Sequence, residues 1–238
     1  MEVLVINLDE SRDRLEQIKL ALDKYAIPFT RIPAINGSVI ERNEHPEIYK
    51  GSKCLVKNTF ISHSILTGNL TDGELGCALS HLKAYNYILC NKLDGAIILE
   101  DDFVPDCNIV EVITNALKVK PKADIITGRA GLHIGLRNAF WNTFSKIPNT
   151  DRKIIRVGIP GFNWFFNRRR RHSSTGCYYI SAKACSKLLF LAYPVRFESD
   201  VLTGMVAMNG LKYYSIQPPL GKTFGEATIR KHGGTKFI

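Results

Sequence analysis

The sequence predicts an α/β fold, a single domain whose mixed, mostly parallel central sheet is flanked by helices. Three observations predict it. The chain opens with a strand–helix–strand pattern, which is how a doubly wound domain begins. A later apolar run, residues 95–99, ends abruptly in three carboxylates, as expected of a buried strand with an acidic carboxyl tip. The 238 residues contain no internal repeat and no low-complexity linker, so we expect one domain.

The elements of the first half follow from apolar spacing and turn residues. Short apolar runs bounded by turn signals predict strands, and apolar residues every three or four positions predict helices. Ser11 is the predicted cap of the first helix, which Pro28 ends, and Thr71 or Asp72 caps the long helix. In order, the predicted elements are strand 3–8, a helix from 11, strand 29–32, short helices and loops over 41–70, helix 71–89 and strand 95–99.

The second half is predicted in the same way. Residues 128–149 are rich in glycine and aromatic side chains and show weak periodicity. Ser181 caps a helix that Pro194 breaks. The remaining predicted elements are helix 109–117, strands 124–127, 154–157 and 176–180, helices 181–191 and 197–208, and strand 212–216.

The composition is that of a globular protein with anionic partners. The formal net charge is +10 and the pI is about 9.3, which favours nucleic acid, a membrane surface or a phosphorylated substrate. There is no apolar run of about 18 residues and no signal peptide, so we expect a cytoplasmic protein without a transmembrane helix. The six cysteines form no C-x-x-C pair, and we expect reduced, mostly buried thiols.

The acidic run Glu100, Asp101 and Asp102 is the first candidate site. Alternation along an extended chain places Glu100 and Asp102 on one side and Asp101 on the other. Packed carboxylates repel each other unless a proton or a cation intervenes, and a divalent metal that holds a diphosphate supplies such a cation. The alternative is a strand that runs into a solvated acidic turn.

A second cluster occupies residues 73–81. On a helix, Cys77, Ser80 and His81 fall on adjacent turns of one face, and Glu74 lies where the helix dipole favours a carboxylate. No metal-ligand spacing involves His81, and a satisfied, partly buried histidine is the alternative to a role in a site. The chain has no G-x-G-x-x-G, Walker A or G-x-S-x-G motif, so the common phosphate-binding loops are missing.

These motifs together resemble a known family. G-E-L-G-C-x-L-S-H at 73–81 precedes x-I-I-L-E-D-D-F at 96–103. The opening V-L-V-I-N-L-D-E-S-x-D-R, A-I-N-G at 34–37 and T-G-C-Y-Y-I-S-x-K-A at 175–184 match as well. The combination resembles glycosyltransferase family 25, the lipopolysaccharide and lipooligosaccharide glycosyltransferases. Where that family often has Pro-Val-Asp, this chain has Glu-Ser-Asp at 198–200.

The resemblance implies a GT-A-like fold and an inverting transfer of galactose or glucose from a UDP-sugar. It also implies a divalent metal, typically Mn²⁺, at the acidic motif, and a lipid-linked oligosaccharide acceptor. We predict Asp200, with Glu198 second, as the catalytic base, and Asp102, Glu100 and His232 as metal ligands. The predicted donor-binding residues are Asn7, Leu8, Arg12, Arg14, Glu74, Ser80, His81, Glu100 and Asp101.

Each of these roles has a structural alternative. Asp200 also suits a helix cap, Arg12 and Arg14 an exposed first helical turn, and His232 a solvated chain end. We assign residues 1–127 to nucleotide-sugar binding and residues 128–238 to acceptor binding.

Four consecutive arginines provide the densest positive charge of the chain. They suit either a solvated loop or a contact with an anionic acceptor or lipid headgroups, which would place the protein peripherally on the inner face of the cytoplasmic membrane. A nucleic-acid-binding module is the rival function, because aromatic residues adjoin these arginines, although the acidic run has no use there. A catalytically inactive protein of the same fold is a further alternative. The four residues are Arg168, Arg169, Arg170 and Arg171.

Overall fold

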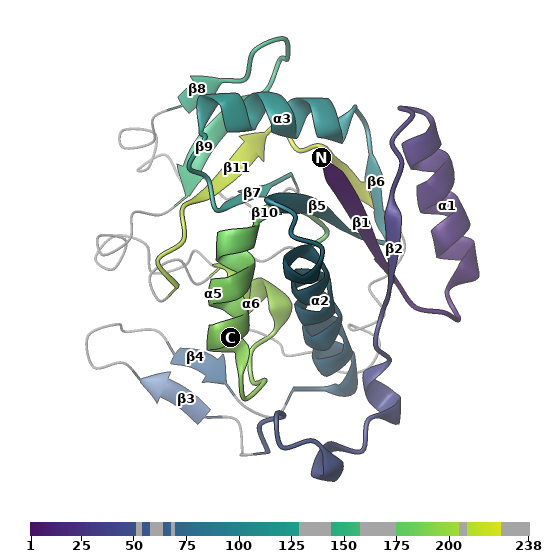
Figure 1. Cartoon of the computed structure of the whole chain (residues 1–238), viewed down its shortest axis with the longest axis vertical. Helices are drawn as coiled ribbons and strands as arrows, with labels where there is room; N and C mark the ends of the chain where they lie inside the picture. The colour runs from purple at the N-terminus through teal and green to yellow at the C-terminus, as the bar shows by residue number, and fades with distance from the viewer. Residues whose placement is uncertain are drawn as a thin grey trace.

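A central eight-stranded sheet organises the computed structural model, which describes residues 1–50, 54–57, 64–67, 70–128, 144–157, 175–204 and 209–224 (Figure 1). Its strands are β1 (Glu2–Asn7), β2 (Thr30–Pro33), β5 (Gly95–Glu100), β7 (Ile125–Thr127), β8 (Phe144–Lys146), β9 (Lys153–Val157), β10 (Cys177–Ser181) and β11 (Tyr213–Gln217). They lie in the order β2-β1-β5-β10-β7-β11-β9-β8.

Strand directions confirm the predicted mixed, mostly parallel sheet. β1 is parallel to β2 and β5, and β11 is parallel to β7. β10 is antiparallel to both β5 and β7, while β9 is antiparallel to β11 and β8. Of the strands in this sheet, β9 and β10 therefore run against all the others. The carboxyl ends of β1 and β5 lie together, because Ile6 pairs with Glu100.

Helices cover both faces of the sheet, as the α/β prediction requires (Figure 1). α2 (Asp72–Cys90), α5 (Ala182–Ala192) and α6 (Ser199–Gly204) pack on one face, and α1 (Arg12–Asp23) and α3 (Ile109–Val119) pack on the other. Each face of the sheet carries its own hydrophobic core, and successive strand residues belong to alternate cores. Ile98 packs toward α2 and α5, whereas Leu99 packs toward α1 and α3. Burial on both faces explains why these strands are continuous apolar runs.

Several short elements were not predicted. β6 (Phe103–Pro105) pairs with β12 (Gly221–Thr223), and β3 (Cys54–Lys57) pairs with β4 (Ser64–Thr67). The expectation of short helices and loops over 41–70 is therefore right for the 3₁₀ turn Arg42–Glu44 but wrong for the β3–β4 hairpin. Another 3₁₀ turn, Gly37–Val39, precedes this range. Strands of three or four residues contain too few positions to show a period.

Two helix boundaries also differ from the prediction. Ser11 occupies the N-cap position of α1, but its side chain makes no capping hydrogen bond, and α1 ends at Asp23, before Pro28. α6 begins at Ser199 rather than at residue 197. None of the helices in the described part of the chain combines the length and the apolar character that crossing a membrane requires.

The amino-terminal half of α2 is fixed by a cap and by a close backbone contact. Thr71 accepts a hydrogen bond from the Glu74 amide, and the Glu74 carboxylate accepts one from the Thr71 amide at 2.7 Å, which forms a capping box. A β-carbon on Gly76 would lie 2.5 Å from the carbonyl oxygen of Ile35, and one on Gly37 would lie 1.9 Å from that of Asp72. The A-I-N-G turn therefore packs directly on the α2 backbone, and only glycines allow this approach.

Candidate active site

Two carboxylates at the end of β5 lie on opposite faces of the sheet. Glu100 faces α2, where it meets His81, whereas Asp101 faces α1, where it meets Asn7 and Arg14. The predicted alternation of these two carboxylates is therefore confirmed. β5 ends at Glu100 and residues 101–102 form a turn, so strand alternation gives no reason for Asp102 to share the side of Glu100.

Glu100 is held by donors from two other elements. Thr175, just before β10, donates its hydroxyl to Glu100 Oε1 at 2.5 Å. The same oxygen lies 3.3 Å from Nε2 of His81, whose side chain is 2% exposed. Side chains from two other segments of the chain thus contact this carboxylate.

His81 and Glu100 belong to a longer polar network between α2, β10 and α6. Nδ1 of His81 lies 2.7 Å from the hydroxyl of Tyr178, which lies 2.9 Å from that of Tyr85. On the other side, the Thr175 hydroxyl lies 3.3 Å from that of Ser199. The network ends at Cys77 Sγ, 3.2 Å from the Ser199 hydroxyl.

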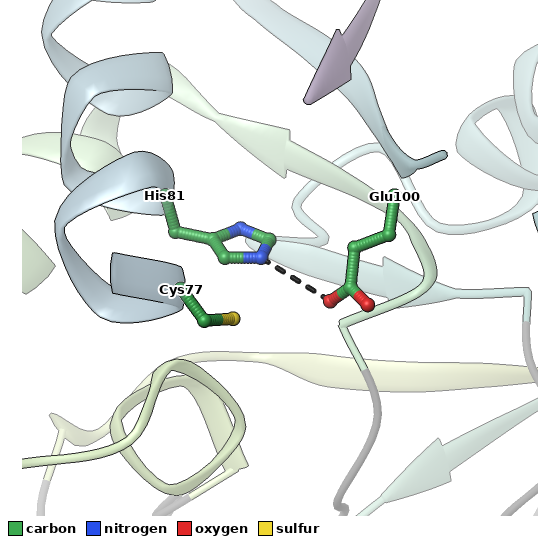
Figure 2. Close-up of side chains that lie close together, drawn as sticks. All are labelled: Cys77, His81 and Glu100. Atoms are coloured by element: carbon green, nitrogen blue, oxygen red, sulfur yellow. Dashed lines mark hydrogen bonds and ion pairs between the residues drawn. The ribbon is translucent and has the colours of Figure 1, made fainter. Parts of the chain in front are cut away.

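Cys77, His81 and Glu100 converge on one point (Figure 2). Cys77 and His81 are one turn apart on α2, and Glu100 reaches them from the end of β5. Their potential ligand atoms, a thiol sulfur, an imidazole nitrogen and a carboxylate oxygen, all lie within 4.8 Å of one another. No other group of three such residues occurs in the part of the chain that the structure describes. His81, for which the sequence indicated no metal-ligand spacing, therefore lies close to two other residues of ligating type.

The two predicted bases lie beside this cluster. The hydroxyl of Ser199, which stands between Glu198 and Asp200 in the sequence, is hydrogen-bonded to the Cys77 thiol. Burial raises the pKa of the Cys77 thiol well above its ordinary value, and the charges of Glu100, Asp200 and Glu198 raise it further. Since the charges of all three carboxylates act on the Cys77 thiol, the predicted bases Glu198 and Asp200 lie close enough to the end of β5 to interact electrostatically with the same group.

A separate network surrounds Asp101. Asn7 donates both amide hydrogens, to Asp101 Oδ2 at 2.8 Å and to the Ser11 carbonyl at 2.9 Å. Arg14 lies 3.3 Å from Asp101 Oδ1, and Arg31 donates to Asn7 Oδ1 at 3.0 Å. Burial raises the pKa of the Asp101 carboxyl above its ordinary value, and the Asn7 bond and the Arg14 charge offset part of that rise. Asn7 therefore orients Asp101 and Arg31, and its amide hydrogens are already committed.

The other predicted donor-binding residues have varied surroundings. Glu74 is used in the capping box, and the Ser80 hydroxyl donates to the Gly76 carbonyl and accepts from the Ile35 amide. Both side chains therefore make hydrogen bonds that stabilise the amino-terminal half of α2 and its contact with the chain at Ile35. Leu8 is half-buried and Arg12 is exposed. Arg168, Arg169, Arg170, Arg171 and His232 lie outside the described residues.

Sequence reasoning missed several members of the site. Thr175, Ser199, Tyr178 and Arg31 were not predicted, because each reaches its partner through the fold and not through local spacing. For Cys77, the signal was present in the i, i+4 pair with His81.

Comparisons with known proteins identify the family. The family model described as glycosyltransferase family 25 (LPS biosynthesis protein) matches residues 1–203. Procollagen galactosyltransferase 1-B of Xenopus laevis is 34% identical over 101 residues, which are 42% of this chain and 16% of that protein. A Haemophilus influenzae protein with a provisional glycosyltransferase name is 24% identical over 221 residues, 90% of this chain and 67% of its own.

Among solved structures, A197 from STIV aligns over 95% of this chain and 87% of its own, with a TM-score of 0.47 and 11% identity. A likeness of that degree supports no argument about function. The family model, in contrast, takes in most of the chain and both motifs of the site. This chain belongs to glycosyltransferase family 25.

Proposed function

We propose that the protein is an inverting, metal-dependent glycosyltransferase that moves galactose or glucose from a UDP-sugar to a lipooligosaccharide or lipopolysaccharide core. The family description supports the pathway, and the name of the Xenopus laevis galactosyltransferase supports transfer of a hexose. The observation that carries the proposal is the connection of the β5 tip to the 198–200 segment through Glu100, Thr175 and Ser199. It brings a carboxylate base next to the acidic strand end where a donor would bind.

The transfer needs one proton acceptor and one in-line substitution. The acceptor hydroxyl oxygen forms a bond to the anomeric carbon of the donor sugar, while the bond from that carbon to the diphosphate oxygen breaks. The hydroxyl proton passes to a carboxylate, Asp200 in this proposal, with Glu198 as the second candidate. The bonding electrons leave with UDP.

Asp102 is the residue we assign to the metal. Hard divalent cations such as Mg²⁺ are commonly bound by one or two carboxylates together with substrate phosphates, so Asp102 together with the donor diphosphate would hold Mn²⁺. Glu100, the second predicted ligand, faces α2 and lies beside His81 and Thr175. When bound, the cation neutralises charge on the departing diphosphate. Phe224 donates its amide to the Asp102 carbonyl at 2.9 Å, so the segment that leads to His232 starts beside this turn.

The donor and acceptor are assigned to different parts of the chain. Residues 1–127 hold the nucleotide sugar, with Arg14 and Arg31 positioned by Asp101 and Asn7. Residues 128–238 hold the acceptor, and the basic surplus of +10 suits its phosphates and an anionic cytoplasmic membrane surface. Vesicle association that weakens as ionic strength rises would support this placement.

UDP release from a panel of UDP-sugars, with and without Mn²⁺, tests the proposal. We expect UDP-galactose or UDP-glucose to be hydrolysed slowly without acceptor and transferred rapidly to a core oligosaccharide. Asp200→Asn should lower turnover by about 10²–10⁴-fold, the usual share of a general base. It should retain protection by UDP against thermal unfolding, whereas the exposed Asp151→Asn control should keep full turnover.

Two results would contradict these assignments. Full turnover in Asp200→Asn removes the base assignment. A chain that UDP does not protect, and that shifts instead with single-stranded oligonucleotides, favours the nucleic-acid-binding alternative.

A further inference from the structure

We propose that Cys77, His81 and Glu100 bind a divalent transition-metal ion of the zinc class, separate from the cation assigned to Asp102. Thiolate, imidazole and carboxylate are the three ligand types that Zn²⁺ uses in proteins. Hard cations such as Mn²⁺ prefer oxygen ligands, so the sulfur in this group selects against them.

The spacing of the ligand atoms fits a tetrahedral ion. Two ligands about 2.0–2.1 Å from a metal at a tetrahedral angle are about 3.3 Å apart. Nε2 of His81 and Oε1 of Glu100 are 3.3 Å apart. A charge-assisted hydrogen bond between such groups would measure about 2.7–2.9 Å, so the observed separation is long for direct pairing. The thiol lies within 4.8 Å of one imidazole nitrogen of His81 and one carboxylate oxygen of Glu100, and a movement of about an ångström brings it into coordination range.

Each proposed ligand contacts a hydroxyl group outside the group. Tyr178 contacts Nδ1 of His81 at 2.7 Å, Thr175 donates to Glu100, and Ser199 contacts Cys77. Outer partners of this kind orient metal ligands and are a regular part of metal sites. When Nδ1–H of His81 donates to Tyr178, the Nε2 lone pair faces the Glu100 carboxylate, and a cation between them removes the repulsion.

Two of the three proposed ligands are partly exposed to solvent, so a metal ion can reach them. Cys77 is partly exposed and the Glu100 side chain is 26% exposed, while the His81 side chain is buried. Three protein ligands leave a fourth position for water or a substrate group, the arrangement of zinc sites with an open position. The ion would join α2 to the end of β5.

Cobalt substitution tests the site on the full-length chain without donor or acceptor. After chelation and reduction, the protein is titrated with Co²⁺, and the spectrum is read for sulfur-to-cobalt charge transfer and tetrahedral d–d bands. We expect one ion per chain with both features, displaced by Zn²⁺ but not by excess Mn²⁺. Cys77→Ser should abolish the charge-transfer band and weaken Zn²⁺ binding by at least about tenfold. Cys90→Ser, at an exposed cysteine of the same helix, should change neither.

A wild-type spectrum without charge transfer, or a band that survives Cys77→Ser, overturns the proposal. If Cys77→Ser does not fold, Glu100→Gln decides instead, because it removes one ligand charge and should weaken Co²⁺ binding while the sulfur band persists. Unchanged Co²⁺ affinity in Glu100→Gln also overturns the proposal. Since these readouts need no sugar transfer, they are independent of the outcome of the UDP-release assay.

Discussion

Gly76→Ala should destabilise the protein, although alanine is the better helix residue. The new β-carbon would lie 2.5 Å from the Ile35 carbonyl oxygen and 2.8 Å from the Gly37 amide nitrogen. Both obstacles are backbone atoms, so relief requires the A-I-N-G turn and α2 to separate. Overpacking of this kind costs about 1–3 kcal/mol, and the severe contact favours the upper value. Replacing helical glycine returns about 1 kcal/mol, which leaves a net loss of about 2 kcal/mol.

Urea and thermal denaturation measure this loss. For a chain of this size, 2 kcal/mol corresponds to a fall of about 4–8 °C in Tm. Gly73→Ala is the matched control, because Gly73 lies in the first turn of the same helix and is exposed. The free energy of unfolding of the Gly73→Ala variant should be unchanged or slightly raised. If Gly76→Ala were as stable as the wild type, the inferred close contact between the turn and α2 would be refuted.

Three further outcomes are expected. Thr71→Ala should lower the free energy of unfolding by about 1 kcal/mol, measured in urea, because it removes the α2 cap. Tyr178→Phe should cost about 1–3 kcal/mol in the same assay, since it removes a buried partner of both His81 and Tyr85, and an unchanged value would contradict the network. Burial raises the pKa of Cys185 from 9.0 to about 12, so the folded state keeps this proton where the unfolded state loses it. The free energy of unfolding should therefore fall as the pH rises from 9 to about 12. Cys185→Ala should make this decrease shallower by about 1.4 kcal/mol per pH unit, whereas Cys90→Ala should leave it unchanged.

The long elements could be predicted from sequence because their local signals agree with the fold. The apolar run of β5, the periodic face of α2 and the caps Thr71 and Ser181 each needed no distant partner to be recognised. β6, β8 and β12 have three residues each and are strands because of what they pair with. Their existence depends on long-range pairing that periodicity does not report.

The candidate site divides in the same way. Alternation within β5 correctly placed Glu100 and Asp101 on opposite faces, since that rule is local. It does not apply to Asp102, because residues 101 and 102 form a turn after the end of β5. The hydroxyl groups of Thr175 and Tyr178, far along the chain from their partners, could be found only from the folded structure.

The close contact at Gly37 and Gly76 lies next to the Cys77, His81 and Glu100 cluster, so the two are expected to move together. The A-I-N-G turn contacts Gly76, and the next residue, Cys77, begins the i, i+4 pair that faces Glu100. A shift of α2 away from the turn would move Cys77 and His81 relative to a strand tip that is held by the sheet. Gly76→Ala should therefore weaken Co²⁺ binding as well as stability, although its β-carbon points toward the turn and not toward the ligands. Equal loss of stability with unchanged Co²⁺ affinity would show that the contact supports the fold without positioning the site.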